Sequence, residues 1–153
     1  MSNVIGLLTE TNYKIITTAQ KGFFVGAEVP GVDLSKKLSK EITNAHANYR
    51  ALVFPDQFIS SDDLQHFGRY FGELSVHLFF TNTEGNSELI IFDNKEGNPP
   101  ASTDVWHTDE TFRGSPPMGV ILYSKVIPSY GGDTNFTIIA TIYDGLSDRL
   151  QCF

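Results

Sequence analysis

The spacing of apolar positions predicts two helices in the first half of the chain. The first would begin after Ser39, a candidate N-cap, and place Ile42, Ala45 and Tyr49 on one face. This face repeats at intervals of three and four residues, which is the period of a helix that buries one side. A helix against a hydrophobic core is therefore expected here.

The second predicted helix has the clearest boundaries in the sequence. Ser60 and Asp63 have the spacing of a capping box, in which each side chain bonds the backbone N–H of the other residue. Gly72 is expected to end the helix. Its apolar face would be formed by Leu64, Phe67 and Phe71.

Short segments rich in β-branched and aromatic residues predict strands elsewhere, separated by turns such as Pro116-Pro117. An amphipathic helix with Tyr143, Leu146 and Leu150 on one face is expected near the C-terminus. This order predicts a mainly β fold, a sandwich or barrel, with flanking helices. The predicted strands cover residues 13–18, 22–29, 52–54, 88–93, 105–112, 118–127 and 133–138.

Length and composition narrow the classes of function. The 153 residues, 41% of them hydrophobic, suffice for one folded domain. The 18 acidic residues exceed the 11 basic ones and give a net charge of -7, which opposes binding to nucleic acid or to an anionic membrane. No apolar run approaches the roughly 20 residues of a membrane span. Together with a single cysteine, these features predict a cytoplasmic protein.

The triplet His107-Thr108-Asp109 carries the first candidate chemistry. Side chains alternate along a strand, so His107 and Asp109 would project from the same side. An imidazole nitrogen and a carboxylate oxygen suit Fe(II), Mn(II) or Zn(II). On its own the triplet is weak evidence, because most such triplets are surface polar residues. The opposite side, expected to be core at its two aromatic positions, would carry Trp106, Thr108, Glu110 and Phe112.

Further motifs accompany this triplet in a fixed order. They are Gly26-Ala27-Glu28, Gly31-Val32-Asp33-Leu34, Phe71-Gly72-Glu73-Leu74, Asn98-Pro99-Pro100, the full string Trp106 to Phe112, Pro116-Pro117, Pro128 and Gly131-Gly132-Asp133-Thr134. From about Gly26 to the C-terminus, this succession resembles the taurine/α-ketoglutarate dioxygenase family of Fe(II)- and 2-oxoglutarate-dependent oxygenases.

The resemblance implies a double-stranded β-helix, or jelly roll, that uses Fe(II), 2-oxoglutarate and O2 to hydroxylate a small organic substrate. It implies that His107 and Asp109 are the first two iron ligands. It also implies that Thr134 bonds a carboxylate of 2-oxoglutarate. From the residues alone, Thr134 is equally well a β-branched strand residue after a Gly-Gly turn.

The resemblance also implies where the substrate binds. His77 stands where the taurine enzyme holds the substrate sulfonate, whereas Phe80 replaces a substrate-contacting Tyr and Thr103 replaces an Asn. These replacements argue against taurine itself and leave another small anion, of the alkylsulfonate kind, as the expected substrate. His77 could instead be a partly buried histidine satisfied by the backbone.

Two family residues have no counterpart after Asp109. No His follows it, and the only arginines there are Arg113 and Arg149, neither placed to pair with the far carboxylate of 2-oxoglutarate. We therefore expect residues 1–153 to be the N-terminal part of one catalytic domain, an incomplete jelly roll with little activity alone. Its open strand edges would favour a homo-oligomer or a partner. The alternatives are a non-catalytic metal-binding β-module completed by a partner chain, and a hydrolytic or Zn-binding β-domain.

Overall fold

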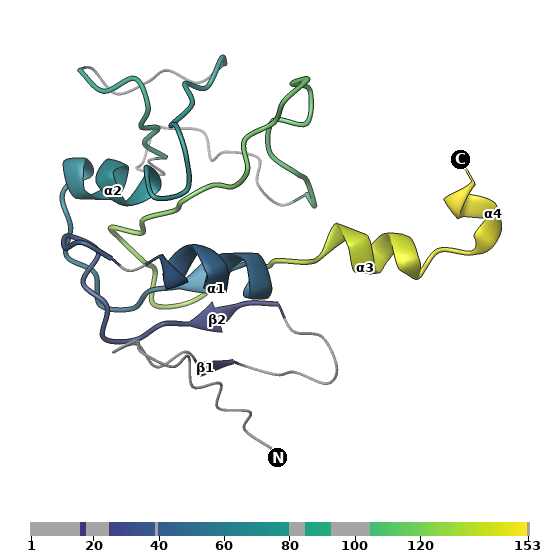
Figure 1. The fold of residues 1–153 in the computed structure, drawn as a ribbon, viewed down its shortest axis with the longest axis horizontal. Helices are drawn as coiled ribbons and strands as arrows, with labels where there is room; N and C mark the ends of the chain where they lie inside the picture. The colour runs from purple at the N-terminus through teal and green to yellow at the C-terminus, as the bar shows by residue number, and fades with distance from the viewer. Residues whose placement is uncertain (1–15, 18–24, 39, 80–84, 93–104, 153) are drawn as a thin grey trace. The chain divides into compact units, whose positions relative to one another are not determined.

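The computed structural model describes residues 16–17, 25–38, 40–79, 85–92 and 105–152 (Figure 1). They fall into two compact units, each described by itself below. The sheet unit comprises Met1–Phe58 and Lys125–Phe153, and the central unit comprises Ile59–Ser124. The elements are β1 (Ile16–Thr17), β2 (Ala27–Glu28), α1 (Glu41–Tyr49), β3 (Leu52–Val53), α2 (Ser61–Gly68), α3 (Ile139–Asp144) and α4 (Asp148–Gln151).

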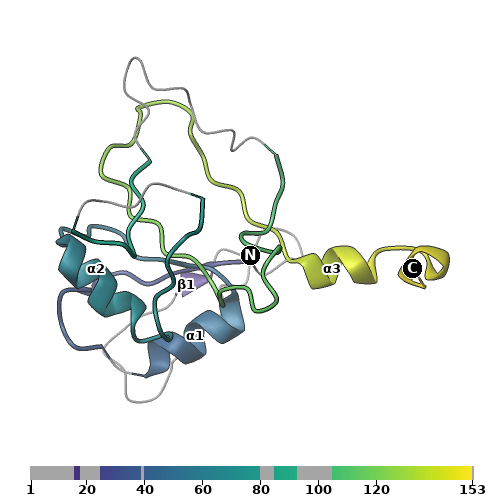
Figure 2. The same ribbon diagram turned by 90° about the horizontal axis from the view of Figure 1, so that it is seen from above.

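The sheet unit contains a three-stranded sheet in the order β1-β2-β3. β1 and β2 are antiparallel, whereas β2 and β3 are parallel, with Ala27 opposite Leu52. A parallel pair needs a crossover connection, and α1 supplies it between β2 and β3 (Figures 1 and 2). The Val29 N–H extends the pairing by donating to the Val53 carbonyl at 2.8 Å.

The core of the sheet unit lies where the helical period placed it. Ile42 and Ala45 of α1 are buried, as predicted. The helix starts differently, because its N-cap is Lys40, which makes no side-chain capping bond, and Ser39 lies outside the described residues. The remaining buried apolar residues of this core are Ala27, Val29, Val32, Leu34 and Leu38.

The start of α2 confirms the predicted capping box. The Asp63 N–H donates to Ser60 Oγ at 3.2 Å, and the Ser60 N–H donates to Asp63 Oδ2 at 2.9 Å. These bonds satisfy N–H groups that the first turn of a helix leaves without partners. A local sequence pattern therefore decides where this helix begins.

The end of α2 comes earlier than predicted, at Gly68 rather than near Gly72. The chain tightens there, because the Phe71 N–H donates to the Gly68 carbonyl at 2.9 Å, three residues back instead of four. The predicted apolar face survives this change. Phe67 is buried and packs edge-to-face on Phe71, with ring centroids 5.4 Å apart.

The strand predictions failed in the second half of the chain. None of the described residues in 88–92, 105–112, 118–127 and 133–138 lies in a strand. A strand needs a neighbour that accepts and donates its backbone hydrogen bonds, and composition alone does not supply that neighbour. Several apolar side chains of these segments, such as Ile91, Val120 and Val126, are exposed instead.

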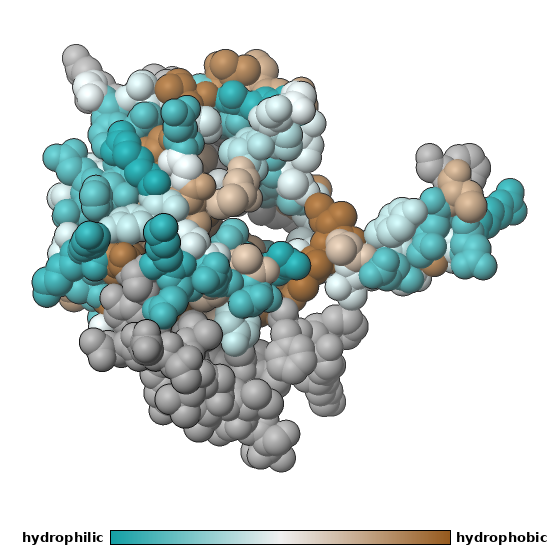
Figure 3. Space-filling view, viewed as in Figure 1, coloured by the Kyte–Doolittle hydropathy of each residue, from teal (hydrophilic) through white to brown (hydrophobic). Residues whose placement is uncertain are grey.

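The predicted C-terminal helix is divided into α3 and α4 at Gly145. Tyr143 and Gln151 join the two pieces, since the Tyr143 hydroxyl donates to the Gln151 carbonyl at 2.9 Å and Gln151 Nε2 donates to the Tyr143 carbonyl at 2.8 Å. Neither helix has a buried residue, and apolar side chains reach the surface where α3 begins (Figure 3). Among the described residues, no helix has the length and apolarity to cross a membrane.

Candidate metal centre

His107 and Asp109 lie together in the central unit, in irregular chain that turns at Asp109. His107 Nε2 is 3.3 Å from Asp109 Oδ1, and the two side chains are 57% and 53% exposed. Two ligands at right angles on one metal ion, each with a bond of about 2.1 Å, lie about 3 Å apart. The two donor atoms are therefore spaced to bind one ion that solvent can reach.

The other ring nitrogen of His107 fixes the direction of the imidazole. His107 Nδ1 is 2.7 Å from the Val105 carbonyl oxygen. A carbonyl only accepts, so Nδ1 carries the proton and Nε2 keeps its lone pair for a metal. Histidine ligands are commonly oriented by such a bond from the second nitrogen. The donor set thus fits a divalent ion such as Fe(II).

The described residues provide only part of a metal site. No group of three or more His, Cys, Asp or Glu side chains gathers in the part of the chain that the structure describes. An iron centre of the two-His, one-carboxylate type needs one further protein ligand. His107 and Asp109 would therefore form a half-site, with two of the three protein ligands that such a centre needs.

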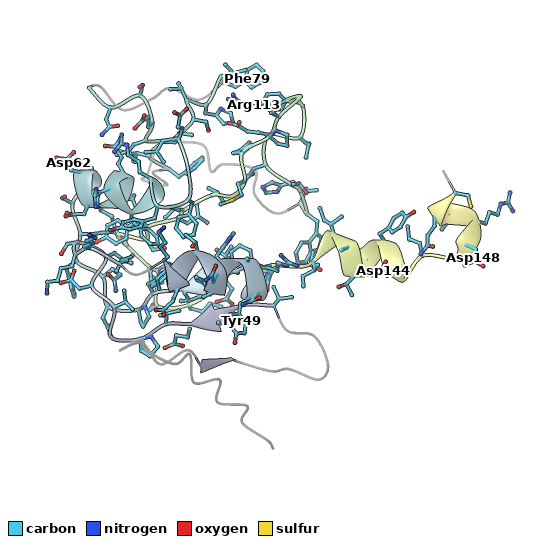
Figure 4. The ribbon with its side chains drawn as sticks, viewed as in Figure 1. Tyr49, Asp62, Phe79, Arg113, Asp144 and Asp148 are labelled. Carbon is cyan, nitrogen blue, oxygen red and sulfur yellow. The ribbon has the colours of Figure 1, made fainter. Side chains whose placement is uncertain are left out.

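Glu110, the neighbour of Asp109, is the functional candidate that sequence reasoning missed. Its backbone has φ 50, its side chain is only 7% exposed, and it forms an ion pair with Arg113. Arg113 Nη2 also donates to the Val76 carbonyl at 2.7 Å, and Figure 4 shows Arg113 near Phe79. The signal in the sequence was the opposite charge of Glu110 and Arg113 at a spacing of three residues.

His77, the predicted substrate residue, lies beside Glu110. Its side chain is 18% exposed, and its Nε2 is 3.4 Å from Glu110 Oε1. The Phe79 N–H donates to His77 Nδ1 at 3.1 Å. The Phe79 ring packs edge-on against His77 and against Phe112, with centroids 6.2 Å and 5.2 Å away. The structure therefore joins His77 to the segment that follows the two candidate ligands.

The remaining predicted site residues are Thr134, Phe80 and Thr103. Thr134 is an exposed residue of the sheet unit and follows Gly131 and Gly132, whose φ angles are 72 and 79. Phe80 and Thr103 fall outside the described residues. The prediction that the two aromatic residues beside the ligands are core was wrong, because the side chains are exposed: Trp106 by 68% and Phe112 by 57%.

Comparison with known proteins identifies the family. The family model described as "Taurine catabolism dioxygenase TauD, TfdA family" matches residues 14–152. The chain belongs to the TauD/TfdA family. The resemblance inferred from the ordered motifs is therefore confirmed.

Similar TauD/TfdA proteins act on several substrates. An alkylsulfatase of Acinetobacter baylyi is 30% identical over 134 residues, which cover 84% of this chain and 41% of that protein. An alpha-ketoglutarate-dependent sulfate ester dioxygenase of Pseudomonas putida is 33% identical over 132 residues, with coverage of 83% and 43%. This chain spans less than half the length of these two relatives.

A solved structure agrees with this assignment. A Burkholderia xenovorans protein described as an alpha-ketoglutarate-dependent taurine dioxygenase matches 92% of this chain and 52% of its own, with a TM-score of 0.69 and 32% identity. TauD-like dioxygenases have a jelly-roll fold. They are enzymes, and they require Fe(II), 2-oxoglutarate and O2.

Proposed function

We propose that this chain supplies the first two iron ligands of an Fe(II)- and 2-oxoglutarate-dependent dioxygenase that hydroxylates a small anionic organic substrate. The observation that carries the proposal is the pair of His107 Nε2 and Asp109 Oδ1, 3.3 Å apart, with His107 Nδ1 directed at the Val105 carbonyl. The names of the relatives, which include sulfate ester and sulfonate dioxygenases, support an alkylsulfonate or sulfate ester as the substrate class.

Each predicted residue has one task in this proposal. His107 and Asp109 hold Fe(II), and the Val105 carbonyl keeps the imidazole of His107 turned toward the ion. Bound Fe(II), together with 2-oxoglutarate and O2, supplies the oxidising chemistry, while the protein orients the substrate and excludes water. Thr134 bonds a carboxylate of 2-oxoglutarate. The substrate pocket is formed in part by His77, Phe80 and Thr103.

We infer further that the chain is the first part of one catalytic domain. A facial triad needs a second His, and the far carboxylate of 2-oxoglutarate needs a cation, best an Arg. The sequence has no His after Asp109, and Arg113 is already paired with Glu110. Another polypeptide segment would therefore have to contribute both groups.

Metal binding by the purified chain tests the half-site. Co(II) is a suitable spectroscopic probe for a site with nitrogen and oxygen ligands. We expect His107→Ala and Asp109→Ala each to weaken Co(II) binding at least about tenfold in an absorption titration, because each removes one of two protein ligands. His66→Ala, on the exposed face of α2 in the same unit, is the matched control and should bind as the wild type does. Equal affinity in all four proteins would contradict the assignment.

A further inference from the structure

Glu110 is a buried carboxylate beside a proposed metal ligand, and its charge needs an explanation. Removing a charged group from water costs several kcal/mol unless a partner and hydrogen bonds compensate. Arg113 is that partner, and its guanidinium also donates to the Val76 carbonyl. Arg113 therefore connects the turn after Asp109 to the segment 76–79, which we call the His77 loop.

The geometry of His77 assigns its ring proton. Nδ1 accepts the Phe79 N–H, so the proton of the neutral ring is on Nε2. Nε2 faces Glu110 Oε1 at 3.4 Å, and Arg113 lies on the other side of that carboxylate. The carboxylate of Glu110 thus lies between the ring of His77 and the guanidinium of Arg113.

We propose that Glu110 is a positioning residue, which fixes the ring orientation and the tautomer of His77 and holds the His77 loop against the turn that follows Asp109. The inference rests on the proposed function only in treating His77 as a substrate contact. Glu110 directly follows Asp109 in the chain. The residue that supports His77 and the proposed carboxylate ligand are therefore neighbours on one backbone. The positive charge of Arg113 offsets the free-energy cost of burying the Glu110 carboxylate.

The tautomer of His77 can be read directly by NMR. Long-range couplings between ring nitrogens and carbon-bound protons in the ¹⁵N-labelled 153-residue chain, without metal, show which nitrogen carries the proton. His77→Asn identifies the His77 signals by their loss. We expect the wild-type ring to be protonated on Nε2. Glu110→Ala should give a mixture of tautomers, because Arg113 and the His77 loop lose the carboxylate that holds them and the Phe79 N–H is no longer fixed against Nδ1. Glu110→Gln should retain the wild-type form, because its amide oxygen can still accept from Arg113.

Glu88→Ala is the matched control for the loss of a carboxylate. Glu88 belongs to the same unit and is also paired with an arginine, Arg69, at 2.9 Å, but not with His77. This variant should leave the His77 signals unchanged. A proton on Nδ1 in the wild type would overturn the proposal even if no variant folds. An unchanged His77 tautomer in Glu110→Ala, or a mixture of His77 tautomers in Glu110→Gln, would also overturn it. Because no metal is present, failure of iron binding would not alter these outcomes.

Discussion

At the scale of single residues, Asp33 shows how a short turn can stabilise one charge. The Ser35 hydroxyl donates to Asp33 Oδ1 at 2.6 Å, the Ser35 N–H donates to the same oxygen at 3.0 Å, and Lys36 Nζ is 2.9 Å from Oδ2. These groups, the Ser35 hydroxyl first among them, lower the pKa of Asp33 to about 2. The negative form of this side chain is thus preferred in the folded protein.

This lowered pKa makes the stability depend on pH. The unfolded chain, in which Asp has a pKa of about 3.9, binds more protons than the folded one between that value and about 2. The contribution of Asp33 is therefore complete above about pH 4 and is lost as the pH falls toward 2. We expect Asp33→Asn to flatten the free energy of unfolding against pH in this window, measured by urea titrations. Glu73→Gln, an exposed control, should keep the wild-type slope.

The residues of the candidate site differ in how far along the sequence their partners lie. The spacing in His107-Thr108-Asp109 keeps the two candidate ligands within one short segment, so the sequence could predict that they lie together. The task of Glu110 depends on His77, and that of Arg113 depends on Val76, 37 residues away. No local pattern predicts that the His77 loop returns to this turn. The sequence therefore indicated the two candidate ligands but not the contacts that surround them.

The same distinction holds for whole elements. The start of α2 could be predicted because all the atoms of its capping box lie within four consecutive residues. The parallel pairing of β2 with β3, and the absence of strands from the described residues of 105–138, depend on neighbours that are distant in the sequence. Composition predicts which segments favour a strand, but a ladder forms only where a partner is present.

The cap of α2 makes a quantitative prediction. Ser60→Ala removes the acceptor for the Asp63 N–H and should lower the free energy of unfolding by about 1 kcal/mol in urea denaturation. Ser61→Ala makes the same chemical change one residue later, inside the helix, where alanine is the better helix former. Its effect should be close to zero or slightly stabilising. Equal losses in the two variants would show that the capping bond is not the cause.

For the whole molecule, the main observation is the amount of exposed apolar surface in the second half of the chain. Val126 is 89% exposed, and Trp106, Leu122, Ile127 and Phe136 are exposed as well. Surfaces of this kind commonly mark sites where another polypeptide binds. Where two sheets pack face to face, as in a jelly roll, apolar side chains of this kind are buried between them. Another polypeptide that packs on these side chains would remove them from water.

The ligand count predicts how the isolated chain behaves as a catalyst. With two proposed protein ligands, and with Arg113 of the same unit already paired with Glu110, purified 1–153 supplied with Fe(II), 2-oxoglutarate and ascorbate should form no more succinate than the same mixture without protein. His107→Ala should therefore give the same background rate. Succinate formation stoichiometric with 2-oxoglutarate consumption, and abolished by His107→Ala, would show that two ligands suffice and that the inferred further segment is not required.

The position of β2, α1 and β3 in the first half of the sequence has a consequence for synthesis of the protein. Ala27 pairs with Leu52, and the helix that covers this pair is the connection between the two strands. All these partners are present once residues 25–58 have left the ribosome, before His107 and Asp109 have been translated. Because none of these contacts needs a later residue, they can form on the nascent chain while the two candidate metal ligands are still to come.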